Sequence, residues 1–243
     1  MCEFRNNNMN LDIEQLARYP MESDDWVVTV AIGGVATLLA VFVVPIFVVT
    51  GYTVRAIRAG MEDASEPPVF DEWGSLLTEG LVAAVITFVY QLIPMVVFGV
   101  LVGGSILTFT TGSETAAGLG LFGLFGGLLL WWVLAIVFGY VGLAGVANYA
   151  RERSFGAGFD VAVIRTAVTS RDYAVAWLYV IALNVVVGVL AGALNVVPIL
   201  GGIVGVFLGF YALIIAGWLL GDGFAAATDT HVESTVDEST SVA

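Results

Sequence analysis

Long uncharged runs of hydrophobic residues alternate with short polar connectors along this chain of 243 residues. A helix of about 20 consecutive apolar residues suffices to cross the hydrocarbon core of a bilayer. The pattern therefore predicts an all-α, polytopic transmembrane bundle of about five spans within residues 26–221. The predicted spans are residues 26–54, 81–110, 116–148, 173–194 and 198–220.

Prolines and glycines mark the expected bends and turns of this bundle. Pro45 lies inside the first span and should kink it, and Pro94 lies near the middle of the second span. A polar turn at residues 110–115 separates the second span from the third. Asn195 and Pro198, followed by two glycines, mark the turn between the last two spans.

Polar segments flank and connect the spans. Residues 1–25 are polar, and their apolar positions predict a short amphipathic helix that ends at Pro20. The connectors 55–80 and 149–172 carry apolar residues at helical spacing, which predicts amphipathic helices lying in the membrane interface. The acidic tail, residues 222–243, is rich in Thr and Ser, and we expect it to be disordered.

The distribution of arginine predicts the orientation. Six of the eight arginines lie in the two connectors, which the positive-inside rule places on the cytoplasmic side. With five spans, the N-terminus would lie outside and the C-terminal tail inside. One missed or extra span would move the N-terminus inside.

Composition narrows the class of protein further. Hydrophobic residues make up 59% of the chain and charged residues only 12%, against roughly 25% in a soluble domain. The net charge of -13 excludes an electrostatic nucleic-acid binder. All basic residues are arginine, and the acidic excess without lysine is typical of halophilic proteins, so we expect a halophilic source.

Catalytic constellations are missing from the sequence. The predicted spans contain no Asp, Glu, Lys, Arg or His, which argues against proton-coupled pumps and intramembrane metalloproteases. His231 is the only histidine and Cys2 the only cysteine, so neither a Ser-His-Asp hydrolase nor a soft-ligand metal site can be assembled. We therefore expect no enzyme activity, no cofactor and no metal.

A few polar residues within the spans are candidates for a small polar cavity. The candidates are Tyr90, Gln91, Pro94 and Asn184, because a proline kink frees backbone carbonyls beside polar side chains. The alternative, which we favour, is that Gln91 and Asn184 form hydrogen bonds between helices and hold the bundle together.

Two further sets of residues have a structural and a functional interpretation. Arg151, Arg153, Arg165 and Arg171 are candidate contacts for lipid phosphates, although determination of topology is the simpler explanation. Small residues at four-residue spacing let helices approach closely, either within the bundle or across a homodimer. The candidate packing glycines are Gly188, Gly192, Gly201, Gly205 and Gly209.

An ordered set of motifs runs through the chain. It comprises Tyr19-Pro20, Ser23-Asp24-Asp25-Trp26, Gly33-Gly34, Pro45, Gly51-Tyr52, Arg55, Arg58, Pro67-Pro68-x-Phe70-Asp71-x-Trp73-Gly74, Gly80, Tyr90-x-x-x-Pro94, Tyr149-Ala-Arg151, Phe155-Gly-Ala-Gly-Phe159-Asp160 and Tyr173-x-x-x-Trp177. With these motifs, roughly residues 16–222 resemble an uncharacterised, mostly haloarchaeal family of multi-pass membrane proteins, domain of unknown function family 4013. The resemblance implies an archaeal membrane protein and supplies no activity or substrate.

Two classes of function remain open at this stage. The first is a non-catalytic component of the cell membrane: a scaffold, a lipid-interacting protein or a subunit of a complex, with membrane lipids and a homo-oligomeric or membrane partner. The second is a transporter or channel for a neutral or amphiphilic solute. The absence of charges within the spans favours the first class.

Overall fold

The computed structural model describes residues 13–109 and 114–241, and these residues form helices and short connections without strands. The α-helices are α1 (Ile13–Arg18), α2 (Trp26–Leu38), α3 (Val43–Met61), α4 (Trp73–Phe109), α5 (Glu114–Glu152), α6 (Val161–Thr169), α7 (Arg171–Leu194) and α8 (Pro198–Ser241). Three 3₁₀ turns complete the fold: η1 (Tyr19–Met21), η2 (Leu39–Val41) and η3 (Phe155–Phe159).

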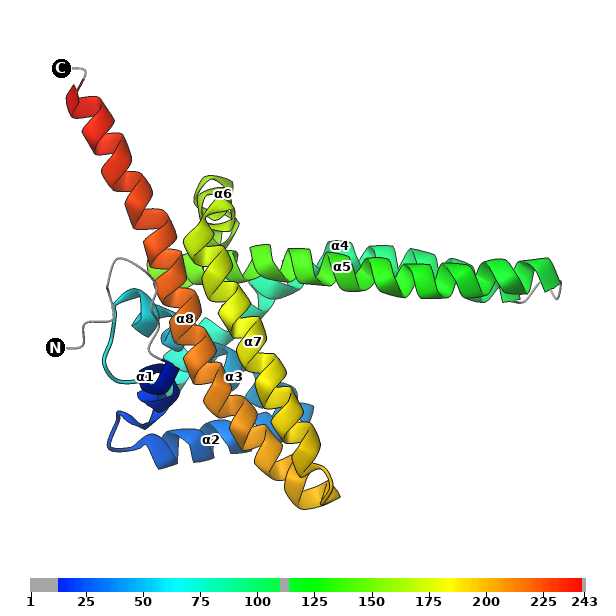
Figure 1. The fold of residues 1–243 in the computed structure, drawn as a ribbon, viewed down its shortest axis with the longest axis horizontal. Coiled ribbons are helices and arrows are strands. Elements are labelled where there is room, and N and C mark those ends of the chain that lie inside the picture. The colour runs from blue at the N-terminus through cyan, green and yellow to red at the C-terminus, as the bar shows by residue number, and fades with distance from the viewer. Residues whose placement is uncertain (1–12, 110–113, 242–243) are drawn as a thin grey trace.

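Six of these helices form three antiparallel hairpins: α2–α3, α4–α5 and α7–α8 (Figure 1). In α4–α5, the Gln91 amide donates to the Ala135 carbonyl near the middle of the hairpin, and Leu101 contacts Gly127 nearer its turn. In α7–α8, Gly201 packs on the backbone of Leu194 beside the predicted turn. The turn predicted at residues 110–115 lies largely outside the described residues.

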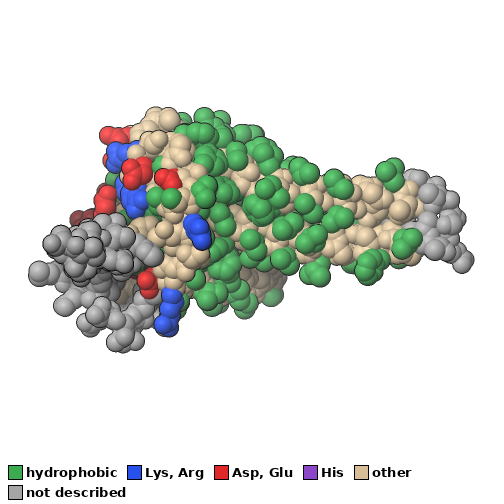
Figure 2. Space-filling view, turned by 90° about the horizontal axis from the view of Figure 1, so that it is seen from above, with side chains coloured by type: hydrophobic (Ala, Val, Ile, Leu, Met, Phe, Trp, Pro, Cys, Tyr) green, Lys and Arg blue, Asp and Glu red, His purple; other side chains and the backbone are tan. Residues whose placement is uncertain are grey.

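The open ends of the hairpins gather at one end of the molecule, which we call the charged end. Arg, Asp and Glu side chains cluster there, whereas the projecting part shows hydrophobic side chains among backbone and other uncharged atoms in this view (Figure 2). The connectors 62–72 and 153–160, η1 and α6 also lie at this end (Figure 1). From the charged end the α4–α5 and α7–α8 hairpins point in clearly different directions (Figure 1).

The hairpins are joined by close helix–helix contacts near the charged end. Gly51 and Gly80 bring α3 and α4 together, since a β-carbon on either residue would overlap a backbone carbonyl of the other helix. Gly60 and Gly221 do the same between α3 and α8. Trp218, almost fully buried, packs against Tyr19 with ring centroids 5.7 Å apart. The core of this protein is therefore the joint between hairpins.

The predicted fold class is confirmed. Among the described residues, five helical segments are long and apolar enough to cross a membrane, namely Val43–Met61, Trp73–Thr108, Gly118–Glu152, Arg171–Leu194 and Ile199–Asp229. Interfacial helices were predicted in both connectors. The second connector contains α6, which buries Ile164 and Ala167. In the first connector, the stretch from Trp73 onward belongs to α4 instead, residues 55–61 belong to α3, and residues 62–72 between them are not helical.

The prediction of one kinked helix over residues 26–54 is wrong. The chain leaves α2 through η2, passes an extended Phe42, and reverses direction into α3. Pro45 lies in the first turn of α3, where proline is tolerated, and its ring would clash with the carbonyl of Val41 in a continuous helix. Both arms instead pack on α8, with Gly33 against Phe210.

Two expectations about the termini also require correction. The last helix does not end at residue 220, because α8 continues to Ser241 and buries Phe224 and Ala227. The segment predicted to be disordered therefore begins as packed helix. The N-terminal segment was expected on the side opposite the C-terminal tail. Instead the Tyr19 hydroxyl donates to the Glu66 carbonyl of the first connector at 3.2 Å, because the α2–α3 reversal returns the chain to the charged end.

Candidate functional site

Three charged side chains are largely buried at the joint between the hairpins. Arg55 and Arg58 come from α3 and Glu79 from α4, and their side chains are only 10%, 15% and 14% exposed. The two arginines are three residues apart and therefore share one face of α3. The close approach at Gly51 and Gly80 brings this face against the first turns of α4. We call these three residues the ion cluster.

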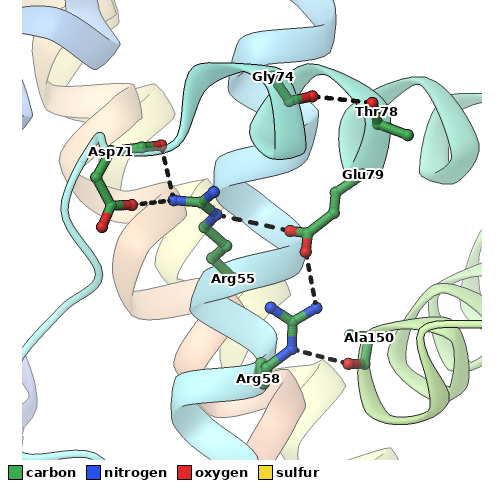
Figure 3. A network of polar contacts seen from close by, with 7 residues as sticks. All are labelled: Arg55, Arg58, Asp71, Gly74, Thr78, Glu79 and Ala150. Atoms are coloured by element: carbon green, nitrogen blue, oxygen red, sulfur yellow. Dashed lines mark hydrogen bonds and ion pairs between the residues drawn. The ribbon is translucent and has the colours of Figure 1, made fainter.

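The ion cluster connects α3 to three other parts of the chain (Figure 3). Arg58 Nη2 lies 3.3 Å from Glu79 Oε1, and Arg55 Nε lies 3.6 Å from Glu79 Oε2. Arg58 Nε donates to the Ala150 carbonyl on α5 at 2.9 Å. Arg55 pairs with the carboxylate of Asp71 and donates to its backbone carbonyl at 3.1 Å. One carboxylate and one peptide carbonyl thus hold α3, α4 and α5 together.

The electrostatic balance of the cluster depends on Glu79. Two buried guanidinium groups face this single carboxylate, while Asp71 is 61% exposed. Removal of one partner from a buried ion pair leaves an uncompensated charge and is strongly destabilising. Arginine stays protonated at all working pH values, so neither guanidinium can take part in proton transfer. The arrangement is therefore suited to attaching the helices to one another.

The first connector is fixed over the ion cluster by tyrosine hydroxyls. Tyr52 donates to the Pro68 carbonyl at 2.9 Å, and Tyr19 donates to the Glu66 carbonyl. Asp63 and Glu72, at the two ends of the connector, have φ angles of 49° and 41°, which are unfavourable for residues other than glycine. A polar pocket of about 350 Å³ lies beneath, lined by residues including Arg55, Arg58, Glu62, Glu66 and Asp71.

The second connector is held in the same manner. Tyr90 donates to the Gly158 carbonyl at 2.9 Å, and Tyr140 donates to the Val168 carbonyl at 3.0 Å. The Asn148 amide donates to the Ala157 carbonyl at 2.8 Å. Tyrosines within the helices thus donate to carbonyls of the connectors and attach the connectors to the bundle.

The residues of the predicted polar cavity are not brought together. Tyr90 faces the second connector, and the Gln91 amide donates to the Ala135 carbonyl of α5 at 3.4 Å. Asn184 donates to the Val180 carbonyl of its own helix at 2.8 Å, so it forms no bond between helices there. Pro94 lies inside α4, which continues past it. For Gln91, the structure has the interhelical hydrogen bond that the alternative interpretation predicts.

The four candidate lipid-contacting arginines differ in their surroundings. Arg151 donates to Asn148 and Thr228, and its guanidinium lies 5.2 Å from the centroid of the Phe224 ring. It therefore attaches the part of α8 around Phe224 and Thr228 to α5. Arg153, Arg165 and Arg171 are exposed, which leaves their guanidinium groups accessible for contacts with phosphate.

The candidate packing glycines also separate into two groups. Gly201 and Gly205 lie against Leu194 and Ala191 and close the α7–α8 hairpin. Gly188, Gly192 and Gly209 have open space where a β-carbon would lie. Gly51, Gly60 and Gly80 of the joint were not singled out by the four-residue spacing, because their contacts are made with other helices.

The ion cluster itself was missed by sequence reasoning. Arg55 and Arg58 were assigned to topology, and Glu79 was counted with the charges of the connector. The available signal was a single glutamate one residue before Gly80 and at the start of a long uncharged helix. Such a position favours burial at the joint. Among the described residues, no group of three or more His, Cys, Asp or Glu is arranged to hold a metal ion.

One family matches most of this chain. The sequence model of a family described as "Protein of unknown function (DUF4013)" matches residues 34–196, which confirms the resemblance. The matched stretch begins in α2 and ends in the turn before α8, so it contains the ion cluster and both connectors. No curated protein and no solved structure matches the chain.

Proposed function

Because the chain belongs to this family of unknown function, we propose a role from its geometry: a non-catalytic, multi-pass component of the cell membrane that acts as a scaffold or subunit of a membrane complex. In this proposal the joint at the charged end holds the hairpins, and the hairpins present apolar surfaces to lipids and to helices of other polypeptides.

The observation that carries the proposal is the α4–α5 hairpin. Of the most hydrophobic stretch of each helix, only 11% in α4 and 6% in α5 is buried inside the protein. Phe122, Phe125 and Leu129 are among their strongly exposed side chains. Beyond the joint, the two helices pack only against each other, so their outer faces remain available for a partner.

The ion cluster supports a non-catalytic role. Its arginines are engaged by Glu79, Asp71 and the Ala150 carbonyl, and it links helices. The transporter alternative has less support, because Tyr90, Gln91 and Asn184 do not converge on a common space.

Purification under native salt, combined with a flux assay, tests the proposed function. We expect the full chain to retain one stoichiometric membrane partner, or to form a defined homo-oligomer, and to conduct no solute in liposomes. Specific solute flux from the purified chain would refute a purely non-catalytic scaffold and would favour the transporter. A monodisperse monomer with neither partner nor flux would also count against the scaffold.

The arrangement of the connectors predicts the orientation of both termini. We propose that the entire charged end faces the cytoplasm, because it carries Arg55, Arg58 and the arginines of the second connector. In a background with Cys2 replaced by Ser, a cysteine at Val196, in the α7–α8 turn, is expected to react with a membrane-impermeant maleimide in intact cells. Cysteines at Asp24 and Ser154 are expected to react only after lysis. If Asp24→Cys, but not Ser154→Cys, reacted in intact cells, the N-terminus would lie outside, as the sequence alone predicts.

The acidic excess predicts dependence on salt. We propose that the protein operates at high ionic strength, as expected for a haloarchaeal source. With a net charge of -13, the folded state is destabilised by self-repulsion, which salt screens within about 3 Å at 1 M. The melting temperature should rise with KCl by about 2–4 °C for each kcal/mol of relieved repulsion. A melting temperature that is unchanged from 0.15 to 3 M KCl, measured in one detergent, would contradict this expectation.

A further inference from the structure

The two arms of the α2–α3 hairpin enclose a groove of about 420 Å³. Ala31, Ile32, Val35 and Ala36 line it from α2, Val48 lines it from α3, and residues of the hairpin turn complete its far end. Trp73, the first residue of α4, lines the end nearer the connectors. Every lining side chain is hydrophobic, so the groove offers no hydrogen-bonding partner for a polar ligand.

The depth of this hairpin places the groove inside the hydrocarbon layer. The charge-free part of α3, residues 43–54, is about 18 Å long at 1.5 Å per residue. The hydrocarbon core is about 30 Å thick. The hairpin that starts at the ion cluster therefore ends within the core. Its turn is suited to this position, because Val41 and Phe42 are 82% and 65% exposed and Pro45 removes one amide donor.

The groove opens away from the rest of the protein. The opposite face of α2 is occupied by α8, with Gly33 against Phe210 and Gly34 against Phe207. On the groove side, Val35 and Val44 are exposed. At this depth the molecules available to fill the groove are the hydrocarbon chains of lipids and other polypeptides.

A lipid hydrocarbon chain fits this groove better than a helix does. An unfilled concave surface loses dispersion contacts, so a mobile chain gains packing by entering it. A partner helix needs an uninterrupted path and an interaxial distance of 8–10 Å, whereas Trp73 at one end and the hairpin turn at the other limit the length of this groove. A single flexible chain can lie between these two limits. We propose that the α2–α3 groove binds one hydrocarbon chain of a bilayer lipid.

Trp73 sets the direction of the bound chain. Indole rings prefer the membrane interface, and Trp73 lies beside Phe70 of the first connector, with ring centroids 5.9 Å apart. The headgroup end of the lipid chain therefore lies near Trp73 and its far end near the hairpin turn. This inference rests on the membrane location in the proposed function.

Quenching of tryptophan by a brominated lipid tests the groove. Two full-length proteins are needed, one retaining only Trp73 and one retaining only Trp132 on the exposed face of α5, with the other tryptophans replaced by Phe. Both are reconstituted in phosphatidylcholine vesicles with dibrominated acyl chains and then exchanged into bromine-free detergent. In the brominated vesicles we expect the fluorescence of both tryptophans to be quenched. After exchange into detergent, the fluorescence of Trp132 should recover, whereas that of Trp73 should remain quenched.

Matched substitutions on α2 show whether the groove holds the lipid. Ala36→Phe fills the groove and is expected to abolish the retained quenching of Trp73. Val28→Phe, at an exposed position outside the lining, should preserve it. With all tryptophans present, native mass spectrometry should find a retained phosphatidylcholine in the parent and in Val28→Phe, and lose it in Ala36→Phe.

Each remaining outcome overturns the inference in a distinguishable way. If Trp73 recovers as fully as Trp132, the groove holds no retained chain. If Trp132 is quenched in vesicles but Trp73 is not, another polypeptide covers the groove. If neither is quenched, the membrane location itself fails, and the proposed function fails with it.

Discussion

Replacement of Glu79 by Gln is expected to lower the free energy of unfolding by about 3–5 kcal/mol, the usual loss when one partner of a buried ion pair is removed. The substitution keeps the size of the side chain but leaves Arg55 and Arg58 facing a neutral amide. The Arg55 and Arg58 side chains are only 10% and 15% exposed, so water replaces the lost charge only in part. Reversible unfolding in mixed micelles with increasing SDS measures the change.

The exposed pair of Glu14 and Arg18 provides the control for this substitution. Their side chains are 73% and 66% exposed, and such pairs contribute about 0–1 kcal/mol. Glu14→Gln makes the same chemical change and should leave unfolding nearly unaltered. An equal effect of the two substitutions would show that the ion cluster does not stabilise the joint.

A double substitution separates loss of charge from loss of packing. Replacement of a buried pair by hydrophobic residues of similar volume is often neutral or stabilising. Glu79→Leu combined with Arg58→Met should therefore recover part of the stability lost in Glu79→Leu alone. No recovery would indicate that the hydrogen bond from Arg58 to the Ala150 carbonyl is the dominant contribution.

The sequence predicts the helices of this protein well where local hydrophobicity decides the structure. The uncharged runs around Pro94 and between Tyr173 and Leu194 lie within single helices. The turn at residues 195–197 is also predicted, because Pro198 cannot continue α7 and is tolerated at the start of α8. These features depend on residues that are near one another in the chain.

Features that depend on distant contacts are not predicted. The hydrophobic run from Trp26 to Val54 gives no sign that the chain reverses near Phe42, since both arms are equally apolar. Their packing on α8 decides the reversal, with Gly33 against Phe210 as one contact. In the same way, composition predicts an acidic disordered tail, whereas Phe224 and Ala227 bury themselves against the joint.

The ion cluster illustrates a further limit of sequence reasoning. The positive-inside rule explains Arg55 and Arg58 without a partner, so it gives no reason to look for one. The partner Glu79 lies on the next helix, 21 residues from Arg58. Only the crossing of α3 and α4 makes the contact, and that crossing depends on two glycines.

Replacement of Gly80 by Ala is expected to destabilise the fold by about 1–3 kcal/mol or more, the usual cost of overpacking. A β-carbon at this position would overlap the Phe47 carbonyl, which is backbone and cannot rotate away. Gly99→Ala, in the same helix, meets open space and should be neutral or stabilising by about 0.5–1 kcal/mol. The two substitutions should therefore change SDS unfolding in opposite directions.

Gly80 and Glu79 should also be coupled, because separation of α4 from α3 moves the carboxylate away from both arginines. The stability lost in Gly80→Ala then includes part of the stability lost in Glu79→Gln. The double variant should be more stable than the sum of the single effects predicts, by about 0.5 kcal/mol or more. Strict additivity would mean that the close approach of the helices and the ion cluster stabilise the joint independently, and that the glycine does not position the carboxylate.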